Sequence, residues 1–200
     1  MREILEREAA ALGVELDANA IQKLEQYLAL LNKWSRSTNV VGTTDPDELV
    51  RYHLVDSLAV LPHLGGARRL VDVGAGGGFP GAVLAAVRPD LEVTALEPIH
   101  KKHAFLSALR RELGLAGFTP LAERDEAHRA QAADRPYEAA VSRATWSVAE
   151  WLPRGALLVQ SGGLVLGMEG REPAELPPGA TRHPYRLGER TRAIILYRPG

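Results

Sequence analysis

A short apolar segment followed at once by a glycine-rich turn constrains the fold more than any other feature. Residues 70–73 read Leu-Val-Asp-Val, and five glycines follow within residues 74–81. Glycine permits sharp turns and lets a ligand approach the backbone without a Cβ in the way. A helix is expected at residues 80–87, and the N–H groups at its start favour bound polar groups. The pattern therefore predicts a strand, a ligand-binding turn and a helix, as in nucleotide-binding α/β folds.

Short apolar runs and helical segments continue to alternate after this turn. Four more strands are expected, at residues 92–96, 118–121, 137–141 and 163–168. Helices are expected between them, at residues 99–113 and 145–154. Two last strands, at 183–187 and 193–197, are separated by a short turn region, which predicts an antiparallel hairpin. We therefore expect the α/β class, with a seven-stranded, mostly parallel sheet that ends in this hairpin.

The first 65 residues have a helical pattern instead. A short helix is expected at residues 2–12, and a longer one follows Asp17, whose side chain suits an N-cap. A third helix begins at Asp45-Pro46 and continues towards the Gly65-Gly66 break. We expect a helical extension over residues 1–65 and a ligand-binding core over residues 66–200, packed as one compact unit.

The acidic residues around the turn discriminate between ligands. Glu97 ends the second strand, where a carboxylate can accept both hydroxyls of a ribose. Residues 76–81 fit the dinucleotide pattern G-x-G-x-x-G, but the first turn glycine is Gly74, and in that register Phe79 replaces the third glycine. Asp72 would repel a pyrophosphate but suits the ammonium group of a methionine moiety. S-adenosylmethionine (AdoMet) is favoured over NAD, and an NAD-dependent dehydrogenase remains an alternative.

Composition excludes several kinds of chemistry. The chain has no cysteine, which rules out disulfides, thiolate nucleophiles and cysteine-based metal sites. Its six histidines lack metal-ligand spacing, so no metal is expected. No apolar run is long enough to span a bilayer, and the first 20 residues are too acidic for a signal peptide. These features fit a cytoplasmic protein without a membrane partner, and the formal charge of −1 indicates no overall basic character.

Four further motifs extend the argument beyond the turn. They are Leu31-Asn32-Lys33-Trp34 with Asn39-Val40, then residues 53–58 (His-Leu-Val-Asp-Ser-Leu), Arg124-Asp125-Glu126 and Ser142-Arg143-Ala144. With the glycine turn, their order and spacing resemble the small-subunit ribosomal RNA guanine-N7 methyltransferase family (RsmG, also called GidB). The resemblance runs from about residue 20 to Tyr197. It implies a Rossmann-like methyltransferase fold, AdoMet as cofactor, and methylation of N7 of a guanosine in 16S ribosomal RNA.

The resemblance also assigns roles to individual residues. The expected cofactor contacts come from the turn and from the ends of the neighbouring strands: Asp72, Gly74, Gly76, Gly78, Phe79, Glu97, Asp125, Glu126 and Arg143. The expected catalytic and pocket-rim residues are Arg143, Asp56, His53 and Asn39. Arg143 would lie at the methionine and substrate side, where a guanidinium suits an acceptor-rich partner. The alternative is an arginine that only pairs with Glu126 or Glu97.

The expected chemistry needs no general base, because N7 carries a lone pair and no proton. Positioning and exclusion of water must then lower the barrier. The expected partner is small-subunit ribosomal RNA or the small ribosomal subunit, bound by a monomer. Two departures stand out: Asn39-Val40-Val41 replaces the usual Asn-Leu-Thr, and Glu169-Gly170 the usual Lys-Gly. The Glu169 departure keeps open a non-catalytic AdoMet-binding regulator, beside a methyltransferase of small molecules or proteins.

Overall fold

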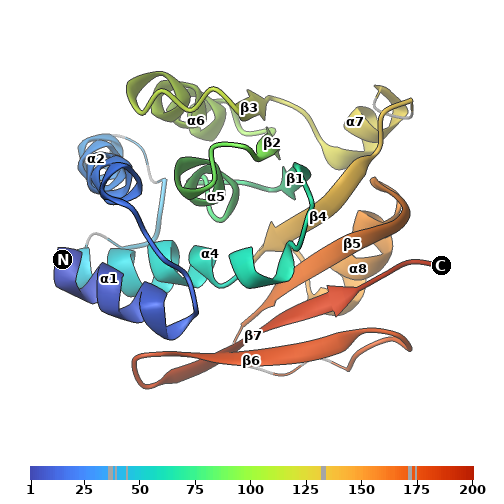
Figure 1. Cartoon of the computed structure of the whole chain (residues 1–200). Coiled ribbons are helices and arrows are strands. Elements are labelled where there is room, and N and C mark those ends of the chain that lie inside the picture. Colours follow the sequence, from blue (N-terminus) through green and yellow to red (C-terminus); the bar gives the residue numbers. More distant parts are fainter. Residues whose placement is uncertain (36–37, 39, 44, 132–133, 171–172, 174) are drawn as a thin grey trace.

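A seven-stranded sheet forms the centre of the molecule in the order β3-β2-β1-β4-β5-β7-β6 (Figure 1). The computed structural model describes the chain except for residues 36–37, 39, 44, 132–133, 171–172 and 174. The strands are β1 (Arg69–Val73), β2 (Glu92–Leu96), β3 (Phe118–Leu121), β4 (Tyr137–Arg143), β5 (Val159–Glu169), β6 (Thr181–Leu187) and β7 (Arg190–Tyr197). Strands β1 to β5 pair in parallel, whereas β7 runs antiparallel to both β5 and β6. The predicted sheet and terminal hairpin are therefore confirmed.

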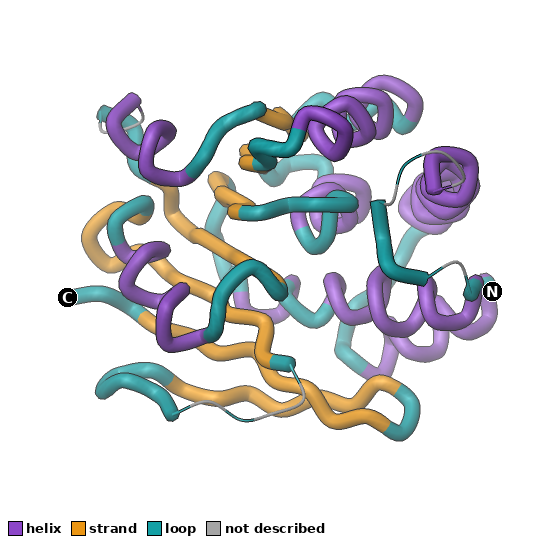
Figure 2. The backbone as a smooth tube through the Cα atoms, turned by 180° about the vertical axis from the view of Figure 1, so that it is seen from behind, coloured by secondary structure: helices purple, strands orange, loops and turns teal. Residues whose placement is uncertain are grey.

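Helices cover both faces of the sheet, as Figures 1 and 2 show from opposite sides. Those of the α/β part are α5 (Gly81–Val87), α6 (His100–Glu112), α7 (Asp125–Gln131) and α8 (Val148–Ala156). Alternate strand residues face opposite sides. Leu70 belongs to the apolar cluster with α5 and α6, and its neighbour Val71 to the cluster with α8. The helix α7 was not among the helices predicted from the sequence.

The described residues of the N-terminal segment form six helical elements. They are α1 (Arg2–Ala11), α2 (Ala18–Ser35), α3 (Pro46–Leu49), the π-helix η1 (Val50–Val55), α4 (Asp56–Leu58) and the 3₁₀-helix η2 (Leu61–His63). Asp17 caps α2 as expected, because its Oδ1 accepts a hydrogen bond of 2.6 Å from Ala20 N. The helix expected from Asp45-Pro46 begins there, but a π-helical turn interrupts it. Such turns occur frequently at functional sites.

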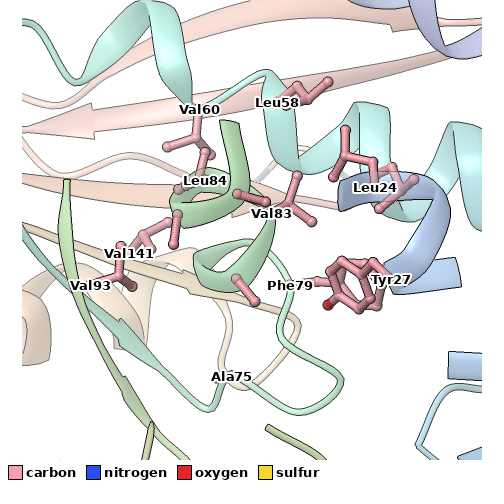
Figure 3. Close-up of a cluster of buried hydrophobic side chains, with 14 of the residues drawn as sticks. Leu24, Tyr27, Leu58, Val60, Ala75, Phe79, Val83, Leu84, Val93 and Val141 are labelled. Atoms are coloured by element: carbon pink, nitrogen blue, oxygen red, sulfur yellow. The ribbon is translucent and has the colours of Figure 1, made fainter. Parts of the chain in front are cut away.

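The N-terminal helices share an apolar core with one face of the sheet. Leu24 and Tyr27 of α2 and Leu58 of α4 belong to one buried cluster with Phe79 and with Val83 of α5 (Figure 3). Their burial stabilises the extension through its packing on the sheet. The division of the chain at residues 65–66 stays a prediction. In the described parts of the chain, no helix is long and apolar enough to cross a membrane.

Candidate active site

The glycine turn is packed tightly on one side and open on the other. Gly74, Gly76 and Gly78 all have positive φ, at 74°, 56° and 88°, a region that side chains disfavour. A Cβ at Gly78 would lie 2.6 Å from the hydroxyl of Tyr27. A Cβ at Gly76 would meet no atom closer than 3.8 Å, apart from its immediate chain neighbours. Gly76 is therefore where a ligand can approach the backbone.

Asp72 lies beneath this turn, completely buried. Its Oδ2 accepts a hydrogen bond of 2.8 Å from Gly81 N, at the start of α5, and its Oδ1 has no partner among the described residues. Burial raises the pKa of the Asp72 carboxyl to about 7, although the hydrogen bond from Gly81 opposes the shift. The contact ties the end of β1 to the start of α5 and so fixes the shape of the turn between them.

Glu97 holds the other rim of the turn. Its Oε2 accepts a hydrogen bond of 2.9 Å from Gly76 N, and its Oε1 accepts one of 2.8 Å from Ile99 N. The side chain is buried, at 4% exposure. A carboxylate offers about four lone-pair sites, so two fixed backbone donors leave room for further donors. The arrangement can therefore orient a carboxylate towards a pair of hydroxyls.

Tyr27 supports the turn from α2. Its ring stacks on Phe79, with centroids 5.2 Å apart and planes at 9°, and its hydroxyl donates to the carbonyl of Gly77. Burial raises the pKa of the Tyr27 hydroxyl well above its usual value, so it remains a donor. Sequence reasoning did not single out Tyr27, although it lies on the apolar stripe of α2.

Arg143 occupies the centre of the site at the carboxyl end of β4. Its Nη1 donates hydrogen bonds of 3.2 Å to Asp56 Oδ2 and to the Tyr52 carbonyl. Its Cζ lies 5.0 Å from the ring centroid of Phe79, in cation–π geometry. The alternative that Arg143 pairs with Glu126 or Glu97 is wrong, because its ionic partner is Asp56 from the helical extension.

His53 and Tyr185 complete the environment of this ion pair. His53 Nδ1 accepts a hydrogen bond of 3.0 Å from Arg143 Nη2. Burial lowers the pKa of His53 to about 3, assisted by the nearby cation of Arg143, so the imidazole is neutral at pH 7. Tyr185 of β6 donates a hydrogen bond of 2.7 Å to Asp56 Oδ1. Sequence reasoning missed Tyr185, which has no motif around it to identify it.

Two other expected site residues face a different partner. Asp125 and Glu126, at the start of α7, both pair with Arg154 of α8, at 3.2 and 2.9 Å. The hydrogen bond from Arg154 lowers the pKa of Glu126 to about 2, while burial raises the pKa of Asp125. Asn39 lies outside the described residues.

The unusual Glu169 does not project freely into solvent. It is buried at 5% exposure and forms a bidentate ion pair with Arg182 of β6, at 2.8 and 2.9 Å. A cation is thus present beside the position where the resembled family usually has lysine. Because Arg182 balances its charge, the acidic residue at this position is compatible with a stable hairpin.

A cavity of about 330 Å³ opens beside Arg143. Most of its lining residues have polar or charged side chains, and they come from the helical extension, the end of β4 and the hairpin strand β7: Gly42, Thr43, Glu48, Tyr52, His53, Asp56, Arg143, Ala144, Arg190 and Arg192. This volume lies within the range of small-ligand sites. The described residues contain no cluster of three or more metal-ligating side chains. The cavity therefore suits an acceptor-rich organic ligand next to the glycine turn.

Comparison with solved structures identifies the fold. The chain superposes on an O-methyltransferase from Bacillus cereus, in complex with SAH, with a TM-score of 0.60, 15% identity and 98% of both chains covered. A methyltransferase from Geobacter sulfurreducens gives a TM-score of 0.61 at 13% identity, covering 88% of this chain and 89% of that one. The prediction of a Rossmann-like methyltransferase fold is confirmed.

Comparison of sequences is more specific. The family model of GidB, rRNA small subunit methyltransferase G, matches residues 20–181. Ribosomal RNA small subunit methyltransferase G of Aromatoleum aromaticum is 40% identical over an alignment 208 positions long, which covers 97% of both chains. The enzyme of that name from Anaeromyxobacter dehalogenans is 44% identical over 170 residues, covering 85% of this chain and 79% of its own. This chain belongs to the GidB family of rRNA small subunit methyltransferases G.

Proposed function

We propose that this protein transfers the methyl group of AdoMet to N7 of a guanosine in small-subunit (16S) ribosomal RNA. Family membership over most of the chain carries the proposal, because the curated relatives are named as small-subunit rRNA methyltransferases. The resemblance of the sequence motifs to the guanine-N7 methyltransferase family implies that N7 is the atom methylated. The site supports it, since the reaction requires a cofactor turn and an adjoining acceptor cavity but no acid–base pair.

The residues of the glycine turn fit AdoMet. Gly76 leaves the space above its Cα open, and Glu97 keeps lone pairs available for the ribose hydroxyls. Asp72 fixes the turn through its hydrogen bond from Gly81. Its carboxyl group would lie below the cationic methionine moiety. Asp125 and Glu126 would lie beside the adenine, with their carboxylates restrained by Arg154.

When bound, AdoMet supplies a methyl group on a positively charged sulfur, ready for in-line attack by a lone pair. The protein's part is to position the acceptor and exclude water. Arg143 would contact an acceptor atom of the nucleotide from its place over Phe79, with its other donors held by Asp56 and His53. A neutral His53 adds no charge to repel the cationic ring that methylation creates.

The function is tested first by calorimetric titration with AdoMet and, separately, with NADH. Methyl transfer from labelled AdoMet to unmethylated small ribosomal subunits and to deproteinised 16S rRNA follows, with digestion to nucleosides and identification of 7-methylguanosine. We expect the protein to bind AdoMet but not NADH, and we expect the label to appear in 7-methylguanosine. Binding of AdoMet without labelled RNA would direct the search to a small-molecule or protein substrate, and binding of NADH would contradict the cofactor assignment.

A further inference from the structure

One wall of the cavity carries two arginines that the cofactor contacts do not use. Arg190 and Arg192 lie on β7, in the terminal hairpin, and both line the cavity beside Arg143. The Cζ atom of Arg190 lies 3.8 Å from the centroid of the Tyr52 ring. This cation–π contact with the π-helical turn holds the guanidinium at the cavity wall.

Arg192 has a hydrogen-bonding group without an acceptor. Its Nε is buried, and no described residue accepts a hydrogen bond from it. A guanidinium has only donors, and leaving a buried donor unpaired is unfavourable. Because Arg192 also lines the cavity, a ligand bound there can supply the acceptor atoms that its guanidinium lacks.

The carboxylates in the same cavity already have partners. Asp56 binds Arg143 and Tyr185, and Glu48 accepts a hydrogen bond of 2.8 Å from Thr43 Oγ1. Among the described residues, no hydrogen bond or ion pair joins Arg192 to Asp56 or to Glu48. Charge complementarity favours an anionic ligand at the β7 side of the cavity.

We propose that Arg190 and Arg192 bind a phosphate group of the acceptor RNA, next to the nucleotide that is methylated. This inference rests on the proposed function. An arginine can pair with O6 and N7 of guanine, but such a contact would engage the N7 lone pair that must attack the methyl group. A phosphate avoids this conflict and matches the planar fork of a guanidinium. With its phosphate on β7, the nucleotide can direct its base past Arg143 towards Phe79 and the glycine turn.

The test measures RNA binding without cofactor, as well as methyl transfer. Wild type, Arg192→Ala, Arg190→Ala and Arg192→Gln are titrated against fluorescently labelled, unmethylated 16S rRNA from 50 to 200 mM salt. Arg198→Ala is the matched control, because Arg198 is exposed beyond the far end of β7 and donates to the Gly162 carbonyl. Thermal unfolding checks that each variant is folded, and Arg192→Gln retains a polar side chain of similar reach should the alanine variant unfold.

For each substitution of Arg190 or Arg192, we expect the slope of log affinity against log salt concentration to become shallower by about 0.7. This is the value for one contact to a phosphate of single-stranded nucleic acid. The KM for small ribosomal subunits should rise roughly tenfold or more, as for a lost charge-assisted hydrogen bond. The affinity for AdoMet and the Arg198→Ala values should stay within about twofold of wild type.

The outcomes separate this inference from the proposed function. An unchanged salt dependence and KM in folded β7 variants of an active enzyme would overturn the phosphate site and leave the function intact. A wild type that binds rRNA but transfers no methyl group would overturn the function, while the salt dependence would still report on the phosphate contact. Absence of rRNA binding by the wild type would overturn both.

Discussion

Substitution of Arg143 by alanine should cost stability as well as activity. An arginine in a pocket is commonly replaced on the assumption that the fold is unaffected. Here the Arg143 guanidinium is the ionic partner of Asp56, at 3.2 Å, and the two side chains are 15% and 3% exposed. Removing one partner of a buried pair leaves an uncompensated charge, which costs about 3–5 kcal/mol. We expect Arg143→Ala to lose that much free energy of unfolding and to transfer methyl groups far more slowly.

A loss of this size is large against the roughly 5–15 kcal/mol that stabilises a typical domain. At about 2–4 °C per kcal/mol for a chain of this size, the melting temperature should fall by roughly 6–20 °C. Urea unfolding followed by circular dichroism measures the free energy, and differential scanning calorimetry measures the melting temperature.

Two further variants separate the buried charge from the lost packing. Arg143→Ala with Asp56→Asn removes the carboxylate but keeps an acceptor for Tyr185, so it should regain about 2 kcal/mol or more without regaining activity. Arg154→Ala is the matched control, since Arg154 also pairs with carboxylates and lies over an aromatic ring but is 40% exposed. Its free energy of unfolding should fall by much less than that of Arg143→Ala, because solvent screens an exposed pair. An equal loss in both single variants, or no recovery in the double variant, would refute the reasoning.

Three more predictions test separate parts of the site. Gly76→Ala should lower the free energy of unfolding by about 1–2 kcal/mol, because Gly76 has a positive φ, and should reduce AdoMet affinity at least tenfold in calorimetry. Gly78→Ala must also displace the buried Tyr27 hydroxyl and should therefore destabilise the protein more. Equal unfolding energies for the two variants would contradict this. Because the folded-state pKa of Asp72 is about 7, above its unfolded value of 3.8, its contribution to stability is present at low pH and is lost as pH rises to about 7. The urea stability of wild type should therefore fall relative to that of Asp72→Asn between about pH 4 and 7, and parallel profiles would refute the shift. Tyr185→Phe removes the hydrogen bond to Asp56 and should lower the free energy of unfolding by about 1–2 kcal/mol. It should also slow single-turnover methyl transfer, while the affinity for AdoMet stays within twofold of wild type. An unchanged rate would exclude a positioning role for Tyr185.

The parts of the fold that sequence could predict are those encoded by local patterns. The apolar run 70–73 and the glycines after it required a strand and a turn, and alternation of strands and helices required a parallel sheet. The helix α7 was missed because its seven residues, Asp-Glu-Ala-His-Arg-Ala-Gln, have no apolar stripe. The π-helix η1 was missed because its apolar residues fit an ordinary helix equally well, so periodicity cannot register the wider turn.

In the candidate site, too, the contacts between residues close in the chain could be predicted and the long-range contacts could not. The turn residues and Glu97 are close together in the chain, and their relation could be predicted from the strand–turn–helix pattern. The partners of Asp56 could not, because Arg143 is 87 positions away and Tyr185 is 129 positions away. No local propensity specifies a contact over such separations. It results from the sheet order, which brings the end of β4 and the hairpin against the helical extension.

Asp56 is therefore the point where three independently encoded segments meet. The parallel half of the sheet supplies the glycine turn at which we propose that AdoMet binds. The helical extension and the terminal hairpin supply most of the cavity wall beside it. A hydrogen bond from Tyr185 and an ion pair with Arg143 join these segments at one carboxylate. Substitutions in the turn should thus change AdoMet affinity, and substitutions at the junction should change acceptor kinetics. A protein built in this way can change residues beside the hairpin, such as the paired Glu169 and Arg182, without disturbing the residues that we propose to hold the cofactor.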